Sequence, residues 1–314
     1  MDQFIQLTVD GFTLGSVYAL IALGYTLVYG VLKLLNFAHG DVFMVGTFAG
    51  FGVLQALGGP ADPKVPIWLV IILVTLAAMV VCAGLGVAIE RFAYRPLRDA
   101  PRIAPLISAL GVSFFLANSM QLLFGATPRN YDLFQYHEGA LYLRGLHIGG
   151  VTVPLLRIIT IVAAFVLMVI LWFLVNKTRT GKAMRATSFD REAAAMMGID
   201  IDRVIVFTFI LGSALAGAAG VMFSLRVPTN VSIGFIAGLK GFIAAVIGGI
   251  GSIPGAMAGG LILGFLESYI QGYVHGAHIP DGTQWSDLYV FSVLIALMLF
   301  RHQGLFGRPD IRKV

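Results

Sequence analysis

The sequence predicts an all-α polytopic membrane protein with about eight or nine transmembrane helices. Hydrophobic residues make up 58% of the chain and charged residues 12%, whereas soluble proteins carry about 25% charged residues. The mean hydropathy is +0.88, and charge-free runs long enough to cross a bilayer recur along the chain. The 38 glycines favour helices that pack closely in lipid. We expect residues 1–314 to form a single transmembrane domain.

Six apolar runs are expected to cross the membrane. A charge at the bilayer centre costs about 2.5–3.5 kcal/mol, so the spans are sought between charges. They cover residues 11–32, 42–61, 65–89, 103–128, 158–176 and 204–225. Residues 125–150 then form the longest outer connection, where tyrosines are expected to anchor at the membrane interface.

The last third of the chain is harder to divide into helices. Residues 241–266 are interrupted by a Gly-Ser-Ile-Pro-Gly sequence at 251–255. We therefore expect two elements joined near Ser252 and Pro254, followed by a final helix from about Gly282. The two helices expected within 234–272 are a broken pair that crosses the membrane fully or a re-entrant hairpin. The sequence is compatible with both arrangements.

The distribution of Lys and Arg predicts the orientation. With the charged segments 90–102 and 176–203 placed in the cytoplasm, 15 of the 21 Lys and Arg lie inside. The positive-inside rule then puts the N-terminus outside and the C-terminus in the cytoplasm.

Residues 176–203, named here the docking loop, concentrate charge between two apolar runs. They hold six Lys or Arg and four Asp or Glu. A short helix from Ser188 to Gly198 is expected, with Thr187 and Ser188 as N-caps and Asp190 in the first turn. A break in the preceding helix is expected at Thr180-Gly181. Since an ordinary basic loop needs no capped helix, we favour a docking surface for a soluble partner.

The expected docking helix has an apolar face that ends in methionines. The residues expected to form the docking surface are Arg185, Thr187, Ser188, Phe189, Asp190, Glu192, Ala193, Ala194, Met196, Met197 and Gly198. Flexible methionine side chains suit a groove in a partner protein.

Four separated motifs resemble a known family. They are LNFAHGDVFMVG at 35–46, RATSFDREAAAMMGI at 185–199, LGSALAGAAGVM at 211–222 and AVIGGIGSIPGAMAGG at 245–260. Together they look like the permease subunits of branched-chain amino acid ATP-binding-cassette (ABC) importers, most of all the H-type (LivH-like) subunit. The similarity covers nearly the whole chain.

The resemblance implies a function and partners. It implies a permease in the bacterial cell (inner) membrane that imports branched-chain amino acids. The implied partners are a second homologous permease, two cytoplasmic ABC ATPases and an extracytoplasmic solute-binding protein. A role in nucleic-acid binding, a cofactor and a catalytic residue are not expected, and no phosphate-binding Gly-x4-Gly-Lys-Ser/Thr loop occurs in the chain.

The docking loop reproduces half of the general ABC importer motif. Glu192-Ala193-Ala194, three residues and Gly198 match its first part. The second part is missing, because Thr208 stands where the motif has Ile and no Leu-Pro follows. The resemblance therefore transfers a docking helix without its individual ATPase contacts.

Polar residues near the membrane are candidates for a pathway or gate. Asn36, His39 and Asp41 are expected at the inner membrane face, either as turn and cap residues or as an inner gate. One His and one Asp are too few for a metal site. Lys240 and Glu267 are expected to neutralise each other or to line the pathway, and reversing both charges should restore transport lost in either single reversal.

The glycines in the interrupted segment are expected to have a packing role, a pathway role, or both. Gly251, Gly255 and Gly259 follow a Gly-xxx-Gly spacing, which favours close helix contact. Such a smooth surface would also let helices slide or line an apolar route for an aliphatic side chain.

Two alternatives to the importer of branched-chain amino acids remain. One is a permease for another small solute, such as a ribose-type sugar, urea or a short amide. The other is a stand-alone secondary transporter or channel with Asp41, Glu267 and Lys240 as an ion relay. A self-sufficient carrier would not need a docking helix.

Overall fold

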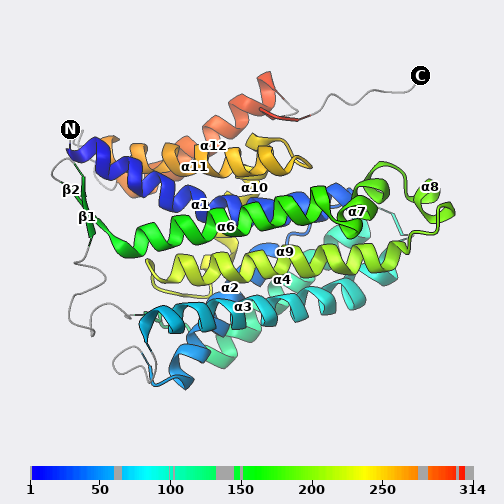
Figure 1. Ribbon diagram of the computed structural model, residues 1–314, viewed down its shortest axis with the longest axis horizontal. Helices are drawn as coiled ribbons and strands as arrows, with labels where there is room; N and C mark the ends of the chain where they lie inside the picture. The colour runs from blue at the N-terminus through cyan, green and yellow to red at the C-terminus, as the bar shows by residue number, and fades with distance from the viewer. Residues whose placement is uncertain are drawn as a thin grey trace.

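A computed structural model describes residues 2–59, 66–98, 100–101, 103–131, 145–148, 151–274, 282–301 and 304–307. Within this part of the chain there are eleven helices and one β-hairpin, so the protein is helical as predicted. Most of the helices lie side by side along the long axis of the molecule (Figure 1). The N-terminal end of α1 and the β-hairpin lie at one end of this bundle, and α7 and α8 lie at the other.

The helices follow the predicted apolar runs closely. The bounds are α1 (Asp2–Leu32), α2 (His39–Ala56), α3 (Ile67–Ile89), α4 (Ile103–Phe124), α6 (Leu155–Lys177), α7 (Arg179–Phe189), α8 (Arg191–Met196), α9 (Ile201–Ser224), α10 (Ile233–Gly248), α11 (Ile253–Val274) and α12 (Gly282–Phe300). Six of the described helices, namely α1, α3, α4, α6, α9 and α11, are long and apolar enough to cross a membrane. The expected span 42–61, which forms the shorter α2, is not among them, and α11 from the interrupted segment is. The final helix begins at Gly282, as expected, while α1 starts nine residues before the predicted run.

The interrupted segment near the C-terminus forms two helices. α10 ends at Gly248 and α11 begins at Ile253. Gly249 and Gly251 both adopt a φ of +97°, a backbone conformation that glycine reaches without steric cost. The expected break is therefore present, a few residues before Pro254.

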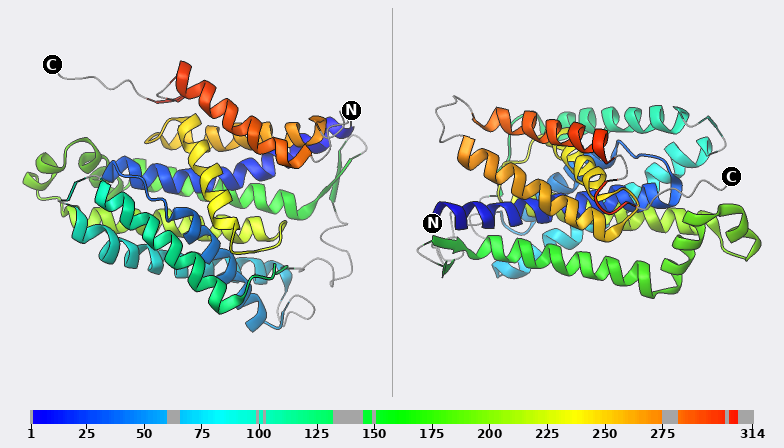
Figure 2. Two further views of the ribbon diagram at one scale, coloured as in Figure 1. Left: turned by 180° about the vertical axis from the view of Figure 1, so that it is seen from behind. Right: turned by 90° about the horizontal axis from the view of Figure 1, so that it is seen from above.

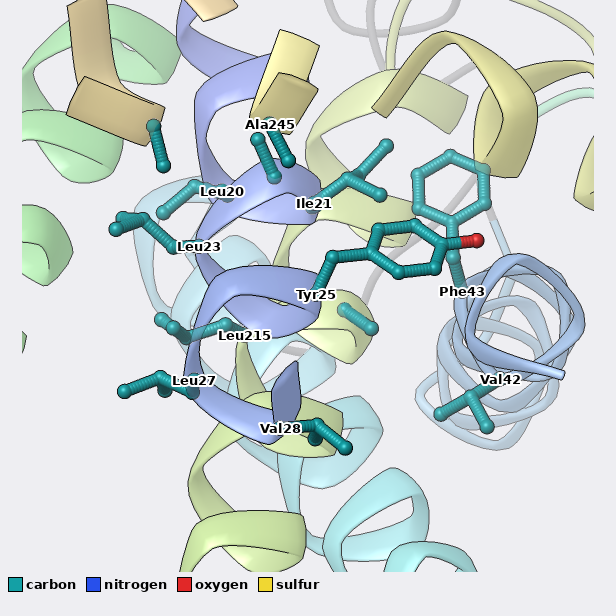
Figure 3. Close-up of a cluster of buried hydrophobic side chains, with 14 of the residues drawn as sticks. Leu20, Ile21, Leu23, Tyr25, Leu27, Val28, Val42, Phe43, Leu215 and Ala245 are labelled. Carbon is teal, nitrogen blue, oxygen red and sulfur yellow. The ribbon is translucent and has the colours of Figure 1, made fainter. Parts of the chain in front are cut away.

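α1 lies at the centre of the bundle. Eighteen of its 31 residues are buried, and it packs against α11, α9, α10 and α6. Figure 3 shows the cluster around it, where side chains of α1 meet Phe43 of α2, Leu215 of α9 and Ala245 of α10. A helix covered on all sides reads as apolar all round in sequence.

α1 and α11 approach closely because small residues face each other. A Cβ on Gly15 would lie 2.8 Å from the Cα of Leu261. On α11, Gly260 and Gly264 meet the backbone of Ala19 and Gly15 with no room for a side chain. This is the close packing expected of small residues between membrane helices.

α2 and α10 are shorter than the other core helices. Their 18 and 16 residues span about 27 and 24 Å, less than the ~30 Å hydrocarbon core. In Figure 2, α10 crosses the direction of α1 at a steep angle. The two helices touch at glycines, since a Cβ on Gly238 would lie 2.7 Å from the Cα of Gly40.

At the end opposite α7 and α8, short extended segments close the bundle. β1 (Gly145–Ile148) and β2 (Val151–Pro154) pair antiparallel, and Arg129 pairs with Thr229 through backbone hydrogen bonds of 2.8 Å. Tyr131 does not anchor at an interface as expected, because it is buried and donates to the carbonyl of Thr47 at 2.6 Å. The other tyrosines of the 125–150 connection lie outside the described residues.

Candidate docking and pathway sites

The docking loop folds into two helices that stand beyond the end of α6. α6 ends at Lys177, and Thr178 starts the next helix by accepting a hydrogen bond from the backbone N–H of Gly181 at 3.1 Å. The break therefore comes before the predicted Thr180-Gly181 pair, which lies inside the first turn of α7. In Figure 1, α7 and α8 together form the tip of this end of the bundle.

The N-cap of the short docking helix is Asp190. Its Oδ1 accepts from the N–H of Ala193 at 3.0 Å, and α8 then runs for six residues. The expected caps Thr187 and Ser188 instead belong to the last turn of α7, so the expected single helix from Ser188 to Gly198 is wrong. The C-terminal stop is as predicted, since Gly198 follows α8 with a φ of +80°.

The tip exposes three large apolar side chains. Phe189, Met196 and Met197 are 87%, 82% and 83% exposed. Glu192 and Ala193 are also exposed, while Ala194 is buried. Because this tip lies outside the spanning helices, the exposed side chains are the kind of patch that binds another protein.

Arginines tie the docking loop to the membrane helices. Arg191 donates to the carbonyls of Val31 and Leu32 at 3.1 and 2.6 Å, and so caps the end of α1. Arg185 likewise donates to the carbonyl of Val175 in α6. Partial burial, with Arg98 nearby, lowers the pKa of the Arg191 guanidinium from its ordinary value. A movement of the tip would reach the central helix through these bonds.

A second group of charges holds the neighbouring loop against α9. After α3 the chain continues as a π-helical turn and a 3-10 turn over residues 90–97. Arg95 and Arg98 both pair with Asp202 at the start of α9, and Arg98 also pairs with the buried Glu90. These residues and Arg191 were not predicted from the sequence to have a site role. The sequence feature that could have indicated them is the alternation of acidic and basic residues in these loops. Such a pattern does not show which residues distant in sequence form pairs.

His39 and Asp41 lie deeper in the bundle than the inner membrane face at which they were expected. The His39 ring packs edge-on against Tyr25 of α1, with ring centres 4.7 Å apart. Tyr25 lies seven residues before the end of α1, which is roughly 10 Å along the helix. The chain therefore turns back into the bundle after α1 before α2 begins.

Asn36 has the turn role proposed as one alternative. Its side-chain carbonyl accepts from the N–H of Ala38 at 3.2 Å and from the hydroxyl of Tyr94 at 3.3 Å. His39 is buried against Gly24 of α1. These contacts fix the re-entry of the chain.

Asp41 does not cap α2 as expected. It lies in the first turn of the helix, is 4% exposed, and accepts a hydrogen bond from the hydroxyl of Ser113. Ser113 is the eleventh of 22 residues in α4, so the bond lies at about half the depth of that helix. A cavity of about 580 Å³ opens beside it between α4 and α10.

Lys240 and Glu267 form the expected ion pair. The Nζ of Lys240 in α10 lies 2.7 Å from Oε1 of Glu267 in α11 and 2.9 Å from Oδ1 of Asp287 in α12. The hydroxyl of Tyr18 donates to Oε2 of Glu267 at 2.8 Å. The network joins four helices, and its members Tyr18 and Asp287 were not predicted from the sequence.

The candidate glycines serve the α10–α11 contact. Gly251 lies in the turn between the helices, and added Cβ atoms on Gly255 and Gly259 would collide with the backbone of Gly248 and Ala244. None of the three lines the cavity beside Asp41.

Comparison with known proteins decides the family. Residues 7–300 match the family described as "Branched-chain amino acid transport system / permease component". The chain belongs to this family. It is a multi-pass membrane component of a transport system and not an enzyme, in agreement with the prediction. Within the described residues there is also no cluster of three or more potential metal ligands.

Individual relatives agree with this assignment. The chain is 39% identical to the "High-affinity branched-chain amino acid transport system permease protein BraD" of Pseudomonas aeruginosa, over 99% of this chain and 98% of BraD. It is also 39% identical to the corresponding protein LivH of Escherichia coli, with the same coverage. A probable LivH of Methanocaldococcus jannaschii is 26% identical over 92% of this chain and 88% of its own. PsaBC from Streptococcus pneumoniae, solved with a Fab, has a TM-score of 0.49 at 12% identity over 92% of this chain and 90% of its own, too weak a likeness to carry an argument.

Proposed function

We propose that this chain is one permease half of an ATP-driven importer that moves leucine, isoleucine and valine across the bacterial inner membrane. The family assignment and the two relatives at 39% identity over 99% of the chain support this substrate class. The proposed assembly contains a second homologous permease, two cytoplasmic ABC ATPases and an extracytoplasmic solute-binding protein.

The proposed orientation puts the N-terminus outside and the C-terminus in the cytoplasm. The α3–α4 loop, the end of α1 and the docking loop contact one another at one end of the bundle. Residues 305 and 306 bond to the end of α10, at Ile247 and Gly248, and this supports a tail that leaves toward the same end. The pair α10–α11 then crosses as a broken element, with α10 strongly tilted.

The observation that carries the proposal is the tip of the docking loop. Phe189, Met196 and Met197 stand almost fully exposed on a capped segment that is bonded to α1 through Arg191. One of the two ATPases would take this tip in a groove. When the ATPases close on ATP, they would move the tip, and the bonds of Arg191 would pass the movement to the central helix.

The direct test is uptake by the reconstituted transporter. The complete complex, placed in liposomes with its solute-binding protein, should accumulate leucine, isoleucine and valine only when ATP is hydrolysed. A matched complex whose ATPases cannot hydrolyse ATP is the control. Uptake that continues in this control would favour a stand-alone carrier, and uptake of ribose or urea in place of leucine would overturn the substrate class.

A further inference from the structure

The cavity beside Asp41 combines polar and apolar lining within the membrane-spanning part of the bundle. Ser113, Gln121, Asn230 and Ser232 line it together with the carboxylate of Asp41. Polar groups at membrane depth are stable only where protein or water covers them. The surface immediately around Asp41 is therefore unsuited to contact with lipid.

The cavity extends from the middle of the membrane to the outer end. Asp41 and Ser113 mark its deep part. Its other part is marked by Ala126 and Pro128, which lie beyond the outer end of α4, and by Asn230, which lies just before α10. Its volume of about 580 Å³ falls in the range of small-molecule sites.

Asp41 is a carboxylate without a cationic partner among the described residues. Eight ion pairs are found there and none includes Asp41. Its recorded side-chain partner is the hydroxyl of Ser113. A buried carboxylate in a membrane protein normally pairs with a cation or marks a ligand pathway.

The walls of the cavity suit a molecule with one cationic and one aliphatic part. Phe114, Val231, Phe235 and Ile236 add apolar surface next to the carboxylate. An aliphatic amino acid has this chemistry, with an ammonium group for a carboxylate and a hydrocarbon side chain for an apolar wall. The side-chain amides of Gln121 and Asn230 can donate to its carboxylate group.

We propose that Asp41, assisted by Ser113, binds the α-ammonium group of the amino acid in transit through this cavity. This inference rests on the proposed import function and adds the point of recognition within the membrane. It also assigns the α4–α10 side of the bundle to the translocation pathway.

The charge preference of the cavity can be measured with thiol reagents. Ala117 lines the cavity and is replaced by cysteine in the assembled transporter; the native Cys82 is buried. A cationic aminoethyl and an anionic sulfonatoethyl methanethiosulfonate are added from outside, with and without nucleotide. The rate at which each reagent modifies the introduced cysteine is divided by the rate at which the same reagent modifies a free thiol in solution. The cationic reagent should react about tenfold faster, because a carboxylate attracts it.

Adding Asp41→Asn to Ala117→Cys should bring the two corrected rates close together. Phe115→Cys, on the exposed part of α4 outside the cavity, should react with neither charged reagent. Equal corrected rates before Asp41 is changed, or no reaction at Ala117→Cys in any nucleotide state, would overturn the proposal.

Uptake assays distinguish a failure of this inference from a failure of the proposed import function. Asp41→Asn should lower leucine uptake by at least about tenfold, the value of a hydrogen bond to a charged group, while ATP hydrolysis stimulated by the binding protein stays within about twofold. Asp41→Glu should retain most uptake, and Ser292→Ala, whose hydroxyl donates to the carbonyl of Leu288 in the same helix, should match the unmodified protein. Normal uptake with Asp41→Asn removes only the inference. Absence of leucine uptake by the unmodified transporter removes the proposed function.

Discussion

The docking tip and the α4–α10 side both leave large apolar side chains uncovered, but their surroundings differ. At the tip, Phe189 and Met197 stand beside charged residues beyond the ends of the spanning helices. On α4, where three of 22 residues are buried, Phe114 and Phe115 are exposed within a span. Exposure therefore indicates a soluble partner in the first region and a membrane environment in the second.

A comparison of α4 with α6 shows why the α4 environment is not lipid alone. Both helices are long, apolar and largely uncovered. The hydroxyl of Thr160, near the start of α6, is buried and bonds to its own helix, and the exposed side chains of α6 include Val162, Val166 and Phe173. By contrast, α4 directs Ser113 to Asp41 and places Gln121 in the cavity. α6 is thus suited to lipid and α4 to a pathway or a second permease.

Removal of the exposed apolar side chains at the tip should have the largest effect. The combined substitution of Phe189, Met196 and Met197 by serine is expected to weaken ATPase binding by at least about 100-fold, because a few buried apolar anchors dominate such interfaces. Co-purification of the ATPases measures the loss. Met298→Ser, at a partly exposed methionine in α12, is the control, and undiminished co-purification of the triple variant would contradict the docking role.

The Lys240 network tests how α10 is held beside the cavity. Lys240→Met would leave the buried Glu267 without its cation, which is expected to cost about 3–5 kcal/mol of stability. The thermal unfolding midpoint of the purified complex should fall accordingly. An unchanged midpoint would show that the ion pair does not hold α10.

Asp287 changes the expected outcome of reversing both charges. Lys240→Glu with Glu267→Lys restores one ion pair but places the new carboxylate at position 240 against Asp287. Rescue of transport should therefore be incomplete until Asp287→Asn is added. Full rescue by the double reversal alone would mean that Asp287 contributes nothing.

The contact between α2 and α10 offers a smaller test on the same side. Gly238→Ala would place a methyl group 2.7 Å from the Cα of Gly40, and such overpacking costs about 1–3 kcal/mol. Gly84→Ala in α3, where nothing lies within 4 Å, should not lower the midpoint. Equal stability of the two variants would disprove a tight contact between α2 and α10.

Substitution of Arg191 is expected to have the smallest effect. It tests whether the bonds of Arg191 pass the movement of the tip to α1. Arg191→Ala removes the bonds to α1 but keeps the exposed tip, so the ATPases should still co-purify. The number of leucine molecules imported per ATP should fall by at least about tenfold, because losing even one bond from a charged donor costs about 1.5–3 kcal/mol. Arg203→Ala, at an 88% exposed side chain, should leave this ratio unchanged; a similar fall in both variants would contradict this role of Arg191.

The predictability of the two regions from sequence also differs, for a physical reason. The tip could be foreseen because caps, a terminal glycine and exposed methionines are local features, although the N-cap moved to Asp190. The spans followed from uninterrupted apolar length. The cavity could not be foreseen, because Asp41, Ser113 and Asn230 come from three separate parts of the chain. The depth of Asp41 in the membrane could not be predicted either, because a turn of the chain back into the bundle does not change the hydropathy of the sequence.

The measurement that tests the account most directly is the sidedness and protection of the tip. Met197→Cys is exposed, and the native Cys82 is buried, so a membrane-impermeant maleimide should report on position 197 alone. We expect labelling in inverted membrane vesicles stripped of the ATPases, no labelling in intact cells, and protection once the ATPases are added back. Labelling from the outside of intact cells, or labelling that the ATPases do not reduce, would contradict it.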